Sequence, residues 1–359
     1  MLLRQKFDDK PSPGINNQLL PLIDYHSDKA YPDSFWTSST PEEQGMDESI
    51  LLKGLDYIRD NKIKIYSLLV IRNNKVVFER YGCNALDNKQ CTPYTLHYIH
   101  SCTKSIVSAL IGIAIGQGHI KSINDPILQY FDDLKIERMS TEKESITIAD
   151  VLTMRSGLEW GESDIEETDF MNAPIPVKYV LDQKMKYPAG EVFNYSSGHV
   201  HILTSLLHRV TGKTPLQYAE EVLLQPLGIV NTPWLADSEG TNYGCFGISL
   251  TARDISKFAS LYLTDGVWEG QKIIPAKWIS DSLEVHTQSN WTKENFGYLW
   301  WLPNETMAAI VGAWGQNTYV IRSHNMIVSF NAKMTFESLG NNLATFTQNY
   351  ICNAILKYS

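Results

Sequence analysis

The sequence predicts an α+β protein in which an antiparallel sheet, flanked by terminal helices, carries an inserted all-helical lobe. Strand-like segments lie near residues 66–81 and 298–330, whereas residues 101–228 have helical periodicity. Strands from both chain ends around a helical middle are most economically joined in one sheet. The expected domains are an irregular N-terminal arm over 1–40, an α/β lobe formed by 41–100 and 230–359, and a helical lobe over 101–229. We expect the active site in the cleft between the two lobes.

The first elements are an amphipathic helix over 48–61 and strands over 66–72 and 75–81. Asn73 and Asn74 join the strands as a two-residue turn, because asparagine tolerates the positive φ that such turns require. Thr147 is a plausible helix N-cap with Asp150 three residues on. The remaining helices are predicted over 101–115, 148–155, 197–210, 215–224, 276–283 and 342–358. The later strands are predicted over 298–301, 307–312, 318–322 and 326–330.

Composition restricts the possible partners. The chain has 359 residues, 43% of them hydrophobic and 20% charged, which is ordinary for a globular protein. A net charge of −9 and the lack of a Lys/Arg cluster argue against nucleic acid and against an anionic membrane surface. The longest apolar stretch, 106–115, is about half of a bilayer crossing, so no transmembrane segment is expected. We expect a monomer or a weak homo-oligomer.

The first residues turn polar too quickly for a signal peptide, so the protein is cytoplasmic if the chain is complete and periplasmic if a leader was removed. Five cysteines are an odd number in a long chain, which favours reduced thiols. No pair of residues has zinc-ligand spacing, and His199 and His201 diverge on the predicted helix. No metal or cofactor is therefore expected.

Ser101 and Lys104 open an apolar helix, where residues three apart share a face. The helix N-terminus opposes protonation of the amine and favours a developing oxyanion. A neutral amine beside a hydroxyl can take its proton and so activate it. Ser-x-x-Lys also occurs by chance, and a serine at a helix start is often only a cap. A lysine entering such an apolar helix is costly unless it has a role.

A Tyr-Ser-Ser element follows at 195–197, and a Gly-rich strand turn at 312–315. This order resembles the serine β-lactamase and penicillin-binding protein superfamily. Within this superfamily, the motifs most resemble those of the class C-like branch, which is close to 6-aminohexanoate-dimer hydrolases and β-lactamase-type carboxylesterases. The resemblance implies the β-lactamase/transpeptidase-like fold and runs from about Trp36 to the C-terminus. The supporting stretches are Pro41-Glu-Glu-Gln-Gly-Met46, Leu152-Thr-Met-Arg-Ser-Gly-Leu158, Tyr187-Pro-Ala-Gly190 and Thr251-Ala-Arg-Asp254.

By that resemblance Ser101 is the nucleophile, Lys104 and Tyr195 move protons, and Ser197 hydrogen-bonds near Lys104. A phenol beside a cation is more acidic than its usual pKa of about 10, which suits it to general acid–base work.

The superfamily's Lys-Thr-Gly or His-Thr-Gly element is absent, and Ile310-Val-Gly-Ala-Trp-Gly-Gln316 stands in its place. It resembles the Gly-x-x-Gly-Gln form of the dimer hydrolases. The match implies an oxyanion hole from the backbone N–H groups of Ser101 and Ala313, with Gly312 and Gly315 in the supporting turn. An isoleucine cannot pair with a substrate carboxylate, so Ile310 disfavours β-lactams.

Six carboxylates between Glu159 and Asp169 form either an acidic lid or a solvated loop. The candidate substrate-binding residues are Trp160, Tyr243, Cys245 and Trp314. The sequence therefore predicts a serine hydrolase that acts through an acyl-enzyme on small esters or linear amides. One alternative is a β-lactamase or D-alanyl-D-alanine carboxypeptidase. The other is a catalytically silent protein that binds peptidoglycan fragments.

Overall fold

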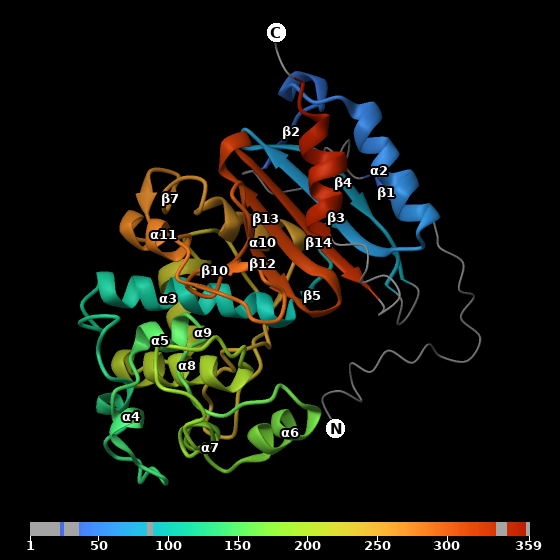
Figure 1. The fold of residues 1–359 in the computed structure, drawn as a ribbon. Coiled ribbons are helices and arrows are strands. Elements are labelled where there is room, and N and C mark those ends of the chain that lie inside the picture. Colours follow the sequence, from blue (N-terminus) through green and yellow to red (C-terminus); the bar gives the residue numbers. More distant parts are fainter. Residues whose placement is uncertain (1–21, 25–35, 85–88, 335–342, 357–359) are drawn as a thin grey trace. The chain divides into compact units, whose positions relative to one another are not determined.

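The computed structural model describes residues 22–24, 36–84, 89–334 and 343–356, and the chain forms two compact units (Figure 1). Unit 1 comprises Met1–His97, Leu250–Leu263 and Val311–Ser359, and unit 2 comprises Tyr98–Ser249 and Thr264–Ile310. Most of the predicted N-terminal arm lies outside the described residues. The predicted lobe boundaries stay a prediction, because a compact unit need not coincide with a domain that folds alone.

Unit 1 is built on four long antiparallel strands in the order β4-β3-β14-β13. Asn73 and Asn74 join β3 to β4 at φ 50° and 61°, which confirms the predicted hairpin turn. Two short strands lie along β4, β1 antiparallel and β2 parallel. The strand bounds are β1 (Ile23–Asp24), β2 (Thr37–Ser38), β3 (Lys64–Arg72), β4 (Lys75–Tyr81), β13 (Gln316–Ile321) and β14 (Met326–Lys333).

Helices cover both faces of this sheet. The Phe330 ring of β14 packs against Phe346, 5.8 Å between centroids, whereas the neighbouring Ser329 hydroxyl hydrogen-bonds to Ser256 at 2.7 Å. Because successive strand residues point to opposite faces, Phe346 and Ser256 mark the two sides. The helices are α2 (Glu48–Asp60), α10 (Ala252–Ser260) and α12 (Leu343–Phe346), the last continued by helical turns over Thr347–Ile351 and Cys352–Ala354, with a short turn at Glu42–Gln44.

Unit 2 is mainly helical, and α3 packs against α8 at its centre. Thr147 and Asp150 form the predicted capping box at the start of α5. Gly112 of α3 lets α11 approach, since a Cβ there would lie 2.3 Å from the Trp278 ring. The helices are α3 (Thr103–Gly116), α4 (Thr141–Glu144), α5 (Ile148–Leu152), α6 (Asp164–Asn172), α7 (Pro176–Leu181), α8 (Ser197–Thr211), α9 (Pro215–Ala219) and α11 (Ala276–Ser282), with turns at Ile127–Tyr130 and Glu220–Leu224.

Two predicted elements differ in the structure. The helix expected from Ser101 begins at Thr103, and Ser101 lies in a 3₁₀ turn over His100–Cys102. The strand expected over 298–301 is displaced to β11 because Leu299, at φ 58°, cannot continue an extended backbone. The other strands are β5 (His97–Tyr98), β6 (Ser249–Leu250), β7 (Val267–Trp268), β8 (Gln271–Lys272), β9 (Thr287–Gln288), β10 (Asn295–Phe296), β11 (Trp301–Asn304) and β12 (Met307–Gly312). Among the helices of the described part, none has the length and apolar character needed to cross a bilayer.

Candidate active site

Ser101 lies at the joint between a strained turn and a buried helix. His100, the residue before it, has φ 49°, a conformation that costs energy for a residue with a side chain. The following helix, α3, is buried from Thr103 to Ala114, so the core fixes its position. Ser101 itself is only partly buried. The backbone of Ser101 is therefore fixed in position while the residue stays partly exposed, and this combination suits a nucleophile.

Lys104 is 3% exposed, and its Nζ atom has three hydrogen-bond acceptors. It donates to Ser101 Oγ at 2.8 Å, to Ser197 Oγ at 3.2 Å and to the Cys245 carbonyl oxygen at 3.1 Å. An ammonium group has three N–H donors, so this arrangement satisfies a charged lysine completely. The predicted juxtaposition of Lys104 with Ser101 and Ser197 is therefore present in the structure.

The charge state of Lys104 differs from the sequence expectation of a neutral amine. Burial acts to lower the pKa, but Tyr195, Cys245 and Glu162 favour the charged form more strongly and raise it above its ordinary value of 10.5. A raised pKa favours the charged form of Lys104, which cannot accept the proton of Ser101. The partial positive charge of one helix end is a weaker influence than several acceptors at contact distance.

Tyr195 is next to this cation. Its ring centroid lies 4.8 Å from Lys104 Nζ, and its ring stacks on Trp301 with 6.0 Å between centroids. The residue directly precedes Ser196, which caps α8 by accepting a hydrogen bond from the His199 N–H. The cap and the stacked ring therefore hold Tyr195 beside the Ser101–Lys104 pair.

Glu162 is the residue of this site that the sequence did not single out. Its carboxylate accepts a hydrogen bond from the Ser197 backbone N–H, in the first turn of α8. Glu162 is exposed, but desolvation of its carboxyl raises the pKa above its ordinary value of 4.5, against the lowering effects of Lys104 and Ser197. A carboxyl group therefore stands near the Ser101–Lys104 pair, where Lys104 and the Ser197 N–H favour its charged form and desolvation opposes it.

Trp160 explains why Glu162, out of six nearby carboxylates, reaches the site. The indole is 3% exposed and lies against Gly198, where a Cβ would come within 2.4 Å of the ring. It also makes edge contacts with Phe170 and His199. The role of Trp160 as a substrate-binding residue stays a prediction, and in the structure its buried ring anchors the loop that carries Glu162.

Tyr243 and Cys245 were also candidate pocket residues. The Tyr243 ring is 3% exposed and packs among Phe170, His201 and Phe246. Cys245 contributes its backbone carbonyl to Lys104, while burial raises the pKa of its thiol. No side-chain pattern predicts that contribution, because every residue has a carbonyl.

Gly312, Ala313, Trp314 and Gly315 belong to unit 1, and their predicted partnership with Ser101 stays a prediction. Within that unit they form a sharp turn after β12, with Trp314 at φ 65° and Gly315 at φ 92°. The Gln316 side chain ties the turn to β14. Its amide N–H donates to the Ala332 carbonyl oxygen at 2.6 Å, and its amide oxygen accepts from the Asn331 side chain at 2.9 Å. Trp314 is 48% exposed.

Within the described ranges, no group of three or more His, Cys, Asp or Glu side chains is placed to hold a metal ion.

Comparison with known proteins places the chain in a family. The family model named Beta-lactamase matches residues 44–338. The chain belongs to this family. The family is part of the serine β-lactamase and penicillin-binding protein superfamily, a superfamily of serine hydrolases, as the resemblance implied.

Individual relatives are distant. The 6-aminohexanoate-dimer hydrolase of Paenarthrobacter ureafaciens is 22% identical over 294 residues, which cover 74% of this chain and 72% of the relative. A putative 6-aminohexanoate-dimer hydrolase structure from Bacillus anthracis superposes with a TM-score of 0.72 at 20% identity, covering 93% of this chain and 90% of that one. A family VIII carboxylesterase structure gives a TM-score of 0.67 at 15% identity, covering 84% and 96%. These structures confirm the predicted α+β fold of the β-lactamase/transpeptidase type.

Proposed function

We propose that this chain is a hydrolase of small esters or linear amides that works through an acyl-enzyme on Ser101. The observation that carries the proposal is Lys104 Nζ held between Ser101 Oγ at 2.8 Å and Ser197 Oγ at 3.2 Å. The Ser101 hydroxyl is partly exposed and is hydrogen-bonded to a buried ammonium group. This arrangement suits the hydroxyl to nucleophilic attack. A protein that only bound fragments would need no such pair, which argues against the silent binding protein.

In the proposed reaction Ser101 Oγ attacks the substrate carbonyl and its proton passes to Tyr195. In this proposal Tyr195 begins as a phenolate beside the charged Lys104, so the proton leaves it a neutral phenol, and the negative charge moves to the carbonyl oxygen of the tetrahedral intermediate. Tyr195 then gives the proton to the leaving alkoxide or amine as the acyl bond breaks. Water attacks the acyl-enzyme, and its proton returns through Tyr195 so that Ser101 Oγ leaves as a hydroxyl. The backbone N–H groups of Ser101 and Ala313 remain our proposed oxyanion hole.

The preference for esters and linear amides over β-lactams rests on two side chains of unit 2. Ile310, which stands where penicillin-processing relatives carry a cation, is completely buried and offers a substrate no charge. Glu162 adds a carboxylate beside Ser197, and this anion repels a substrate carboxylate. Both features disfavour the β-lactamase and carboxypeptidase alternative. The relatives named as dimer hydrolases and carboxylesterases support the same choice.

Steady-state kinetics on a short-chain nitrophenyl ester, a linear amide and benzylpenicillin test this proposal. We expect kcat/KM for the ester or the amide to exceed that for benzylpenicillin at least about a hundredfold, which corresponds to about 2.7 kcal/mol. Intact-mass measurement after a fluorophosphonate should show one adduct, mapped to Ser101.

The matched variants are Ser101→Ala and Ser108→Ala, which make the same change two turns apart. Only the first should abolish labelling and hydrolysis. A β-lactam preference would overturn the ester and amide assignment, and an adduct on another serine would overturn the assignment of the nucleophile.

A further inference from the structure

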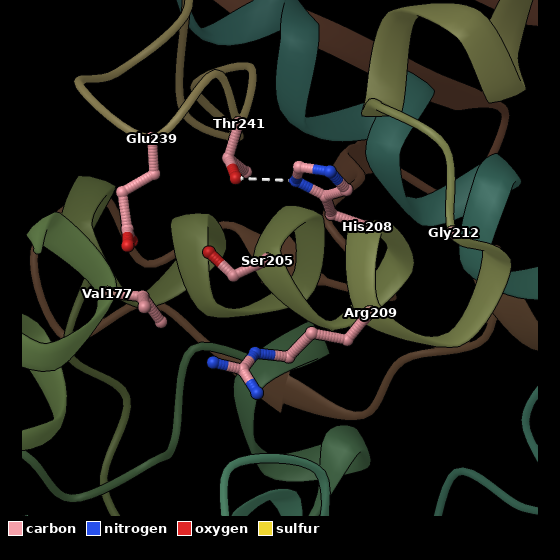
Figure 2. Close-up of a pocket in the computed structure, with 7 residues that line it drawn as sticks. All are labelled: Val177, Ser205, His208, Arg209, Gly212, Glu239 and Thr241. Carbon is pink, nitrogen blue, oxygen red and sulfur yellow. Dashed lines mark hydrogen bonds between the residues drawn. The ribbon is translucent and has the colours of Figure 1, made fainter. Parts of the chain in front are cut away.

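A pocket lies in unit 2, away from Ser101. It has a volume of about 360 Å³ and is lined by Val177, Ser205, His208, Arg209, Gly212, Glu239 and Thr241 (Figure 2). Four of these residues come from the C-terminal part of α8 and the glycine that ends it. Ser205 is eight residues beyond Ser197, a rise of about 12 Å along the helix. The pocket is therefore separate from the Ser101–Lys104 pair.

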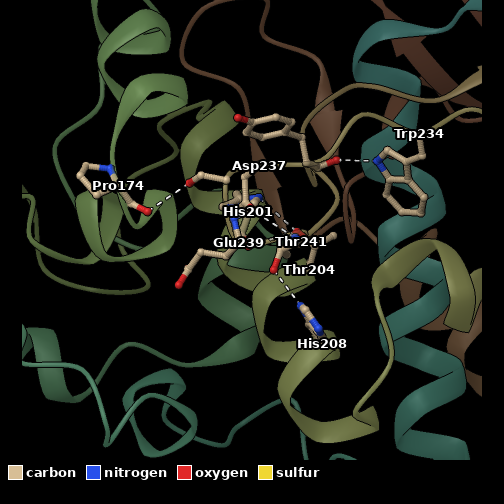
Figure 3. Close-up of polar contacts among 10 residues, drawn as sticks. Pro174, His201, Thr204, His208, Trp234, Asp237, Glu239 and Thr241 are labelled. Carbon is tan, nitrogen blue, oxygen red and sulfur yellow. Dashed lines mark hydrogen bonds and ion pairs between the residues drawn. The ribbon is translucent and has the colours of Figure 1, made fainter.

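The loop over residues 237–241 forms one wall, and a buried hydrogen bond between Asp237 and His201 anchors it. Asp237 Oδ2 lies 3.0 Å from His201 Nε2, with the two side chains 1% and 0% exposed (Figure 3). Asp237 Oδ1 accepts the backbone N–H groups of Glu239 at 2.9 Å and Thr241 at 2.8 Å. Burial acts to raise the pKa of Asp237, but these hydrogen bonds and His201 outweigh it and lower the pKa.

The same loop is tied to both neighbouring walls. Thr241 Oγ1 hydrogen-bonds to His208 Nδ1 on α8 at 2.8 Å, and Ser238 Oγ donates to the Pro174 carbonyl oxygen, just before α7, at 3.1 Å (Figure 3). The pocket is thus formed before any ligand enters, which lowers the entropy cost of binding.

The Ser205 hydroxyl at the floor of the pocket has no hydrogen-bond partner among the described residues, although the side chain is only 4% exposed. The carbonyl it would use within the helix, that of His201, already accepts from Thr204 Oγ1 at 3.1 Å. In Figure 2 the hydroxyl points to the space between Glu239 and Val177. A buried hydroxyl without a partner is uncommon and destabilising, so a ligand atom at this position would satisfy it.

Charged groups of opposite sign stand on the two sides of Ser205. Glu239 is exposed, and no cation within the described residues forms an ion pair with it. Arg209 pairs with Asp133 and the Tyr130 carbonyl oxygen, which use both Nη1 hydrogens and one on Nη2. Its Nε–H and the other Nη2 hydrogen remain for a ligand. Because Asp133 neutralises Arg209, the pocket as a whole is anionic and favours an ammonium group.

We propose that this pocket binds a small zwitterion of the amino-acid class. The ammonium group pairs with Glu239, the carboxylate accepts from Arg209, and the Ser205 hydroxyl completes the contacts of the carboxylate. Val177 covers the aliphatic part of the ligand. This site does not depend on hydrolysis at Ser101, so it survives failure of the proposed function.

The test is an NMR titration of the methyl signals of Val177 in protein whose Ser101 has been blocked by a fluorophosphonate, or in Ser101→Ala if labelling fails. The probes are glycine, β-alanine, 4-aminobutyrate and 6-aminohexanoate, which differ in the spacing of their charges. At least one should shift the signals saturably, and butylamine and butyrate should bind at least about tenfold more weakly. No saturable shift with any of the four up to about 50 mM would overturn the proposal. Equal binding of butylamine would overturn the zwitterion assignment.

Variants locate the ligand. Glu239→Gln should weaken binding at least about tenfold, whereas the control Glu284→Gln, an exposed glutamate outside the pocket, should leave it unchanged. Ser205→Ala should weaken binding several-fold and at the same time raise the melting temperature of the free protein, because it removes an unsatisfied hydroxyl. Unchanged binding in Glu239→Gln, or a lower melting temperature in Ser205→Ala, would contradict the proposed contacts.

Discussion

Unit 2 buries two lysine side chains in different surroundings. Lys104 and Lys143 are 3% and 0% exposed. Lys104 Nζ contacts two hydroxyls and one carbonyl, whereas Lys143 Nζ donates to two backbone carbonyls, those of Glu137 at 3.1 Å and Leu181 at 2.8 Å. Burial therefore does not distinguish them. The chemistry of their partners does, because a hydroxyl can lose its proton and a carbonyl cannot.

Their pKa values move in opposite directions. Burial lowers the pKa of Lys143 from its ordinary 10.5, with Arg138 acting in the same direction and Asp182 opposing both. Burial also acts on Lys104, but Tyr195, Cys245 and Glu162 together raise its pKa. A buried lysine thus indicates a reactive site only when groups that can carry a negative charge surround it.

The largest expected effect is the difference between Lys104→Met and Lys143→Met. The first should lower kcat/KM for a nitrophenyl ester at least about a thousandfold, because it removes the cation beside both Ser101 and Tyr195. The second should leave kcat/KM within about threefold. Circular dichroism checks that both variants fold. Similar losses of activity in two folded variants would mean that Lys104 has only a structural role.

Tyr195→Phe should lower the rate of acylation by about a hundredfold, the scale of a lost positioned proton transfer. Tyr187→Phe, the same change on a tyrosine outside the site, is the control. Stopped-flow measurement of the acyl-enzyme burst separates acylation from hydrolysis. A wild-type rate with activated esters would restrict the role of Tyr195 to poorer leaving groups.

Glu162→Gln should raise the ratio of kcat/KM for benzylpenicillin to that for a neutral ester by about tenfold, because the repulsion of the substrate carboxylate is removed. Asp169→Asn changes an exposed carboxylate of the same acidic run and should leave the ratio unchanged. Parallel steady-state kinetics at one pH measure both ratios. A lower ratio in Glu162→Gln would show that Glu162 does not select against anions.

The smallest expected effects are on the free energy of unfolding at high pH. Lys104 and Lys143 should change it in opposite directions as pH rises. The raised pKa of Lys104 makes a stabilising contribution below pH 10.5 that is lost as pH rises through its folded value. The lowered pKa of Lys143 imposes a cost below its folded value that disappears as pH rises toward 10.5. Urea unfolding of wild type and the two methionine variants between pH 8 and 11 should show these opposite trends. Parallel trends would contradict the assigned charge states.

Much of the site could be predicted from the sequence because it depends on short spacings. Ser101 and Lys104 are one turn apart, and Ser196 and Ser197 stand at the start of a helix whose apolar pattern is unambiguous. Periodicity also predicted the β3–β4 hairpin, whose turn residues specify positive φ. In each case, local residues alone determine the geometry.

The features of the site that the sequence did not predict depend on contacts between residues far apart in the chain. Glu162 differs from its five neighbouring carboxylates only because Trp160 packs on Gly198, which is far along the chain. The Cys245 carbonyl reaches Lys104 across 141 positions and has no side-chain signature. The raised pKa of Lys104 follows from these partners, whereas the short spacing from Ser101 indicated a neutral amine.

Gly198 has a consequence for directed evolution of this protein. A library that varies the residues around Ser197 to change substrate choice would meet a hidden constraint, because any side chain at 198 collides with the Trp160 ring. Displacement of that ring would also release Glu162, two residues further along the same loop. Such variants would change two properties at once, and their phenotypes would be hard to assign. A library with Gly198 fixed and Glu162 varied separately would give results that can be interpreted.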